Sequence, residues 1–192
     1  MVRKNTVALL ALIMSVSSIM AKEHIEPGEF YVVTKALFTT AETISESDDI
    51  DIEGNSGGGL GVDVGYTLPY NFAVELDTSY SRNNIREITT VEDPEEKEEI
   101  VDAKGNYWTF AMDVTYTMPV THTIGLMGKI GYEFEYETIS KLDIDTHDNG
   151  MVYGVGIEYH LSDHYEAIVE YEGSMIDTPR GSSVYTGIKY IF

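Results

Sequence analysis

The chain has 192 residues, of which 33 are acidic and 12 are basic, and its formal net charge is -21 at pH 7. Its mean hydropathy of -0.14 excludes a polytopic helical membrane protein. A polyanion of this size repels nucleic acid, and the absence of cysteine excludes disulfides, a thiol nucleophile and cysteine-ligated zinc.

Residues 1–21 are predicted to form a secretory signal peptide. Arg3 and Lys4 supply a positive start, Val7–Met14 an apolar stretch and Ala21 a small residue suited to cleavage. An N-terminal anchor helix is the alternative. Cleavage leaves a mature domain over 22–192 with ten basic and 33 acidic residues, a net charge of -23.

Eight runs of alternating apolar and polar residues follow, which indicate strands rather than helices. The run after the first turn shows the pattern: Phe72, Val74 and Leu76 alternate with Glu75 and Asp77. No charged residue falls on the apolar side of any run. The runs are at 30–38, 60–68, 72–80, 107–118, 124–136, 151–161, 166–175 and 183–192.

Most runs have about nine to eleven residues, the length a tilted strand needs to cross the hydrocarbon of a bilayer. Closing an even number of such strands leaves no unpaired edge in lipid. The pattern therefore predicts an all-β fold, an eight-stranded antiparallel up-and-down transmembrane β-barrel.

Tyrosines mark the ends of the runs. Tyr66, Tyr116 and Tyr159 each precede a short turn, so they are predicted to form one aromatic girdle on the periplasmic side, together with both chain ends. Longer connections at 40–57, 82–106 and 138–150, and a short one at 177–181, are predicted outside the cell. A second girdle is predicted from Tyr80, Trp108, Tyr136 and Tyr153.

A soluble eight-stranded barrel that holds a small ligand is the rival fold for the same alternation. It would have to enclose the many large rings of the apolar face. The polar face instead carries small residues, as expected where space is tight: Gly61, Gly65, Gly125, Gly131, Gly154, Gly156 and Gly187.

Charged residues of the polar face are predicted to meet inside the barrel. An eight-stranded barrel is just wide enough for its own side chains. We expect a salt-bridged plug, and a narrow cation-selective path is the alternative. The predicted lumen network is Lys35, Asp63, Glu75, Asp77, Asp113, Lys129, Glu133, Glu158, Glu170, Glu172 and Lys189.

The last run, "VYTGIKYIF", ends on an aromatic residue with Ile188 and Tyr190 at alternate positions before Phe192. This ending resembles the C-terminal signature of Gram-negative outer-membrane barrels. The whole mature chain resembles the small OmpA/OmpX-type outer-membrane β-barrel family. The resemblance implies localisation in the bacterial outer membrane, contact with its lipid and lipopolysaccharide, and recognition of Ile188, Tyr190 and Phe192 by the barrel-assembly machinery.

No catalytic, cofactor-binding or metal-ligating residue is predicted. His160 and Ser162 superficially resemble the His-x-Ser arrangement of lipid A deacylases, but they fall at a periplasmic turn, away from lipid A in the outer leaflet. "DDIDIEGNSGGGL" at 48–60 matches a calcium loop only in its first half, because Leu60 stands where a bidentate glutamate belongs. Divalent cations at the acidic loops are a further candidate partner.

Residues 91–106 indicate a mobile charged loop with at most one helical turn. The expected function is therefore a structural or adhesive role that presents acidic extracellular loops. A small cation-selective porin is the alternative. A soluble ligand-binding barrel and a lipid A-modifying enzyme rank lower.

Overall fold

The computed structural model describes residues 27–40, 42–47, 50–89 and 99–192. The predicted signal peptide at 1–21 lies outside these residues. No helix in the described part of the chain is long and apolar enough to cross a bilayer.

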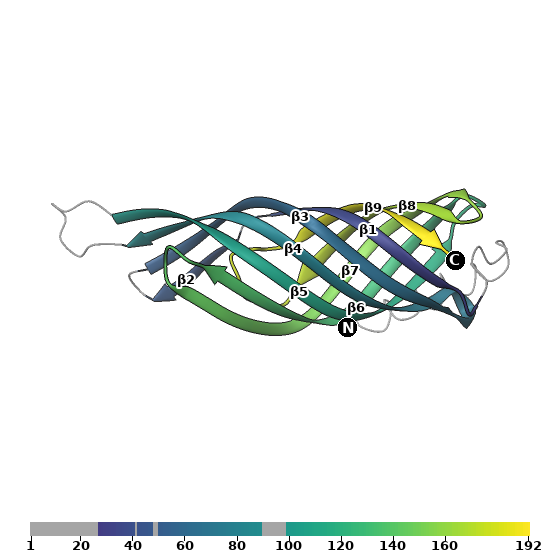
Figure 1. Ribbon diagram of the computed structural model, residues 1–192, viewed down its shortest axis with the longest axis horizontal. Helices are drawn as coiled ribbons and strands as arrows, with labels where there is room; N and C mark the ends of the chain where they lie inside the picture. Colours follow the sequence, from purple (N-terminus) through teal and green to yellow (C-terminus); the bar gives the residue numbers. More distant parts are fainter. Residues whose placement is uncertain (1–26, 41, 48–49, 90–98) are drawn as a thin grey trace, which may run out of the picture.

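Eight strands close into a ring, with one short strand added at one end. Each ring strand pairs antiparallel with its neighbours, in the order β1-β9-β8-β7-β6-β5-β4-β3, and β1 pairs with β3 to complete the ring (Figure 1). The strands are β1 (Phe30–Thr39), β2 (Thr43–Ser47), β3 (Ile50–Leu68), β4 (Phe72–Thr89), β5 (Glu99–Pro119), β6 (Ile124–Ile139), β7 (Ile144–Ser162), β8 (Tyr165–Ser174) and β9 (Ser183–Ile191).

The predicted antiparallel up-and-down barrel is confirmed. Its apolar side chains point outward and its ionic ones inward, as β4 shows: Leu76 is 58% exposed and the adjacent Asp77 is 7% exposed. An exposed belt of large apolar residues in a chain with this much charge fits a lipid surrounding, since water would not stabilise it.

Three predicted loops contain strand instead. The connection at 40–57 holds β2 and the start of β3, and the described parts of 82–106 continue β4 and β5. The connection at 138–150 shrinks to the turn between Ile139 and Ile144. The predicted helical turn is wrong for 99–106, which pairs with β4, because backbone pairing continues where the apolar alternation fades.

The long hairpins all extend from one end of the barrel, to the left in Figure 1, and the C-terminus lies toward the other end. The three short turns lie at that other end: the 3-10 turn η1 (Pro69–Asn71) and the connections 120–123 and 163–164. Tyr70 and Asn71 adopt positive φ in η1, which makes the β3–β4 connection tight.

The interior has an apolar cluster near each end, and the central ions around Lys35 and Lys129 lie between them. One cluster joins Tyr31, Val33, Ala73, Met127, Ile168 and Ile191 near the short turns. The other joins Ile52, Ile85, Ala103 and Ile139 among the long hairpins. Gly65 leaves the space that the Tyr31 ring occupies inside the barrel, because a Cβ at Gly65 would lie 2.1 Å from Cζ of Tyr31.

Candidate functional site: a salt-bridged lumen

Every member of the predicted lumen network is buried, and none is more than 7% exposed. The structure brings these residues together in three groups along the barrel axis, each around one or two cations. Two of the groups contain an ionic residue that the predicted network omits.

The first cation of the central group is Lys35 on β1. Its Nζ lies 2.8 Å from Oδ1 of Asp63 and 2.6 Å from Oδ2 of Asp77. The same Nζ stands 4.3 Å above the ring of Tyr185. The ring face is electron-rich, so it adds attraction for the ammonium in a site without bulk water.

Lys129 on β6 is the second central cation. Its Nζ lies 2.5 Å from Oε2 of Glu172 and 2.7 Å from Oε1 of Glu170, both on β8. Asp77 and Asp113 approach the same Nζ at 3.8 and 3.9 Å. Because Asp77 faces both lysines, the ion pairs connect β1, β3, β4, β5, β6 and β8 across the lumen.

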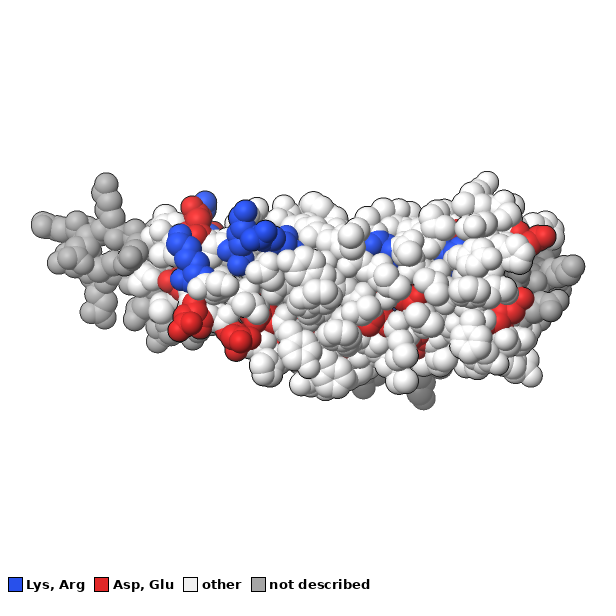
Figure 2. All heavy atoms as spheres, in the orientation of Figure 1, with Lys and Arg blue, Asp and Glu red and all other residues white. Residues whose placement is uncertain are grey.

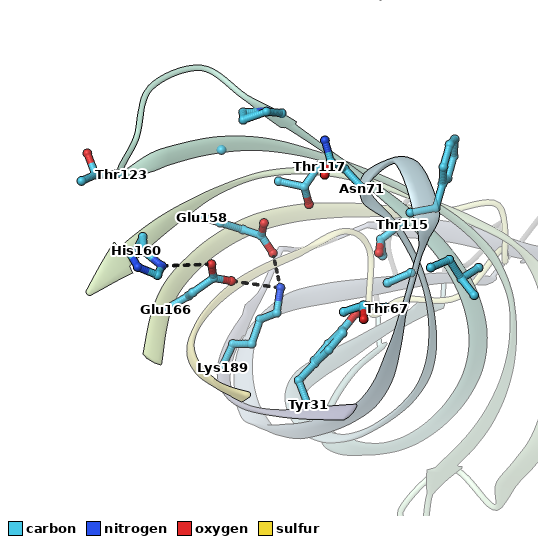
Figure 3. A pocket seen from close by; sticks show the side chains of 15 residues that line it. Tyr31, Thr67, Asn71, Thr115, Thr117, Thr123, Glu158, His160, Glu166 and Lys189 are labelled. Atoms are coloured by element: carbon cyan, nitrogen blue, oxygen red, sulfur yellow. Dashed lines mark hydrogen bonds and ion pairs between the residues drawn. The ribbon is translucent and has the colours of Figure 1, made fainter. Parts of the chain in front are cut away.

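The group that we call the inner group lies at the end of the lumen that carries the short turns (Figure 3). Nζ of Lys189 lies 2.9 Å from Oε1 of Glu158 and 3.0 Å from Oε2 of Glu166. Oε1 of Glu166 is 3.6 Å from Nδ1 of His160. The cavity beside these residues measures about 40 Å³, room for a few water molecules only.

The outer group depends on Arg180 from the connection between β8 and β9. Its side chain enters the lumen, with one terminal nitrogen 3.1 Å from Oε1 of Glu133 and Nε 3.1 Å from Oε2 of Glu135. Arg180 is 2% exposed. A Cβ at Gly54 would lie 1.9 Å from the carbonyl oxygen of Pro179, so this glycine lets the connection pack close to β3.

Three tyrosine hydroxyls complete the polar interior. Tyr31 donates to Oε1 of Glu75 at 2.6 Å, and Tyr185 donates to Oε1 of Glu172 at 3.0 Å. Tyr107 donates to Oε1 of Glu137 at 2.7 Å, beyond the outer girdle. Burial is the main cause that raises the pKa of Glu137 above its usual range, and the hydrogen bond from Tyr107 opposes it.

The ion pairs exist because carboxylates and cations are both costly to bury alone. Removing one partner of a buried pair leaves an uncompensated charge, which typically costs about 3–5 kcal/mol. Among the described residues the interior holds four cations and eleven acids, so every cation faces more than one carboxylate.

The predicted network omits Arg180, Glu135 and Glu166. Glu135 and Glu166 lie on the polar side of their strands and could have been added from alternation alone. Arg180 carries no such signal, because it belongs to a connection between strands and its side-chain direction is not set by parity.

The predicted girdle residues all face outward. Tyr66 stacks with Phe30 at 4.8 Å between ring centres, and Tyr80 stacks with Trp108 at 4.9 Å. Trp108 also pairs across strands with Tyr136. Tyr116 contacts Phe72, and Tyr159 lies next to the third short turn.

Tyr153 does not lie with the other three residues of the predicted outer girdle. It pairs with Ile130, six positions along β6 from Tyr136, and His147 occupies the place beside Tyr136. The alternation of apolar and polar residues predicted the correct face for Tyr153, but β7 continues nine residues beyond it, to Ile144 at the hairpin tip.

The other candidate sites do not assemble. His160 contacts Glu166, while Ser162 is exposed beyond a register shift at the strand end. Asp51 and Glu53 belong to strand β3, not to a calcium loop, and Asp49 lies outside the described residues. Within the described ranges, no cluster of three or more His, Asp or Glu side chains is arranged to hold a metal ion.

Solved structures with the same fold are small outer-membrane barrels. OprG from Pseudomonas aeruginosa aligns with a TM-score of 0.68 and 13% identity, over 87% of this chain and 97% of that one. Ail, the attachment invasion locus protein of Yersinia pestis, solved in complex with the heparin analogue sucrose octasulfate, gives 0.56 and 14%, over 87% and 100%. Neisserial surface protein A gives 0.53 and 14%, over 85% and 97%.

A search of curated proteins finds no match. The family model described as "Outer membrane protein beta-barrel domain" matches residues 8–192, nearly the whole chain. None of these descriptions names an enzymatic activity. The chain belongs to the outer membrane protein beta-barrel domain family, and its place is the bacterial outer membrane.

Proposed function

We propose that this protein is a structural or adhesive barrel whose lumen is closed by its own ion pairs and whose long hairpins present a binding surface outside the cell. The observation that carries the proposal is the connected set of buried ion pairs around Lys35 and Lys129, which crosses the lumen between six strands. Ions would have to displace these side chains to pass.

Arg180 supports the closed lumen from the outer side. A large side chain with two carboxylate partners occupies the space between the central group and the hairpins. The apolar cluster of Ile52, Ile85, Ala103 and Ile139 lies among the hairpins. Water and ions would meet both layers before reaching Lys129.

The hairpins support the adhesive role. They continue as paired strands well beyond Tyr80 and Trp108, so they hold a fixed surface away from the membrane. One neighbour of the same fold, Ail, is named for attachment and invasion. A rigid hairpin orders fewer residues on binding than a flexible loop, which favours affinity.

Single-channel recording in planar bilayers tests the closed lumen. The purified barrel is expected to give no steady conductance. Arg180→Gln is expected to give brief openings, because the outer side chain loses its ion pairs. Large, steady openings of the unmodified protein would contradict the proposal.

A second candidate, a narrow cation-selective path, is favoured by the excess of buried acids over cations. It predicts steady openings and a reversal potential in a potassium chloride gradient that reports cation selectivity. The same recordings therefore separate the two functions.

A trimmed hairpin tests adhesion. Arg86 and Asp102 are directly paired, so residues 87–101 can be replaced by Asn-Gly, a favoured two-residue hairpin turn. Cells that display the trimmed barrel are expected to lose binding to host-cell and matrix surfaces. Unchanged folding, judged by heat-dependent migration in electrophoresis, is the control, and undiminished binding would contradict the role of this hairpin.

A further inference from the structure

The cations of this acidic chain separate into two sets. Among the eight Lys and Arg residues that the structure describes, four are buried in the lumen. The other four are exposed, and most of the Lys and Arg surface visible in Figure 2 lies on the half of the barrel that carries the long hairpins. The exposed set is Arg82 and Arg86 on β4, Lys104 on β5 and Lys141 in the turn after β6.

The strand register places this set on one outward surface. Arg82 pairs with Asn106, and Asn84 pairs with Lys104. Nζ of Lys141 donates to the carbonyl oxygen of Asp102 at 2.6 Å, which draws the β6–β7 turn against β5. The four cations line a groove of about 670 Å³ together with one acid, Asp102, and with Asn55, Ser56, Asn84, Ile85, Ala103, Asn106 and Ser140.

Three of the four cations, Arg82, Lys104 and Lys141, have no ion pair with a carboxylate among the described residues, although Lys141 donates to a backbone carbonyl oxygen. Nε of Arg86 lies 3.2 Å from Oδ1 of Asp102, and Arg86 is also the cross-strand partner of Glu53 on β3. The charge of Arg86 is therefore partly balanced. Arg82 and Lys104 have no ion pair within 4.0 Å among the described residues. These two side chains supply most of the uncompensated charge of the groove.

The height of the groove above the outer aromatic girdle indicates which ligand it can meet. Arg82 is two residues beyond Tyr80 and Lys104 is four residues beyond Trp108, where these two rings mark the outer girdle. At about 3.3 Å per residue and a tilt near 45°, the cations lie about 5–9 Å above the girdle. This is the headgroup layer, where lipid phosphates lie.

We propose that this groove binds the phosphate groups of lipopolysaccharide in the surrounding outer leaflet. Arg82, Arg86 and Lys104 lie on the outward face of β4 and β5, as contact with a lipid ligand requires. The guanidinium of Arg82 can hold two phosphate oxygens, and the ammonium of Lys104 adds a point charge. The amides of Asn84 and Asn106 offer neutral donors to the sugar hydroxyls beside the phosphates.

Trp108, the single tryptophan of the chain, provides the probe, because it lies in the girdle directly below the groove. Lipopolysaccharide is titrated into the refolded barrel in zwitterionic micelles, and Trp108 emission is followed. Parallel titrations use dephosphorylated lipopolysaccharide, inorganic phosphate and heparin. Saturable binding is expected for intact lipopolysaccharide, weakening as salt is raised.

Variants that change the charge of the groove test whether lipopolysaccharide binds there. Each neutralised cation is expected to weaken binding about fivefold, so the double variant R82Q/K104Q should bind about 25-fold more weakly. R82K/K104R keeps both charges and is expected to bind close to the unmodified protein. Asp102→Asn removes the carboxylate beside Arg86 and is expected to bind equally or more tightly.

Several outcomes would overturn the proposal. Equal binding of dephosphorylated lipopolysaccharide would do so without any variant. Unchanged affinity in R82Q/K104Q would exclude the groove. Heparin binding that depends on Arg82 and Lys104 while lipopolysaccharide binding does not would assign the groove to a soluble polysaccharide, and saturation by inorganic phosphate with displacement of lipopolysaccharide would assign it to free anions.

Discussion

The lumen and the outer groove each contain four described cations, in opposite circumstances. In the lumen, Lys129 is 5% exposed and lies within 2.7 Å of two carboxylates. In the groove, Arg86 has one carboxylate contact, and its side chain is 45% exposed. Buried cations are therefore committed to holding strands together, whereas exposed ones remain able to bind an external anion.

The largest expected effect comes from removing a central cation. Lys129→Met leaves Glu170 and Glu172 buried without their counter-ion, and we expect a loss of about 3–5 kcal/mol in the free energy of unfolding. Urea unfolding in detergent micelles measures it. The loss in free energy should be smaller at acidic pH, where protonation neutralises the unpaired carboxylates of Glu170 and Glu172.

Lys104→Met is the matched control for Lys129→Met in this comparison. Its ammonium is exposed and has no ion pair within 4.0 Å, so the free energy of unfolding should change by less than about 0.5 kcal/mol. Equal losses in the two variants would remove the distinction between structural and available cations.

A smaller effect is expected from the tight packing of the lumen. A Cβ at Gly65 would overlap the Tyr31 ring, and Gly65→Ala should cost about 1–3 kcal/mol. Gly128 faces outward, and a Cβ there would meet no atom within 4 Å. Gly128→Ala should therefore cost nothing, and a similar loss in both variants would mean that Tyr31 does not limit the space at Gly65.

The smallest effect concerns the outer rim, where Glu137 is 7% exposed. Because burial raises the pKa of Glu137, its contribution to folding is greatest below the usual glutamate pKa and falls as pH rises through the higher folded value. Glu137→Gln has no such dependence. The two proteins should differ little near pH 4, and the variant should be the more stable at pH 8.

Equilibrium unfolding across this pH range measures the difference between Glu137→Gln and the unmodified barrel. The amide can still accept the hydrogen bond from Tyr107, so packing is conserved. A variant that becomes progressively less stable than the unmodified barrel as pH rises would reverse the sign and contradict the reasoning.

Alternation predicted the parts of the molecule that the membrane constrains. Lipid on one side and a narrow lumen on the other force the even residues of β4 outward and the odd ones inward, so the faces of Leu76 and Asp77 follow from sequence. Above the girdle both faces of the strands meet water, so the apolar residues no longer alternate with polar ones. The sequence therefore does not indicate that β4 stays paired with β5 from Arg82 to Thr89.

The remaining features depend on long-range contacts. Arg180 reaches Glu133 across 47 residues, from a connection whose path no local pattern specifies. The groove likewise arises only when β4 and β5 are in register and Lys141 folds against Asp102. In the sequence these four cations are isolated charges in an acidic chain, so the sequence alone does not identify them as one site.

The central claim, that the apolar face meets acyl chains and the ionic face meets itself, can be tested on the unmodified protein with two methionines. Met112 is 66% exposed on the outer face, and Met127 is 6% exposed in the lumen. The barrel is reconstituted in bilayers containing a lipid with a photoactivatable carbene precursor in its acyl chain, and labelled residues are identified by mass spectrometry. Labelling of Met112 without Met127 is the predicted result, and labelling of Met127 without Met112 would contradict it.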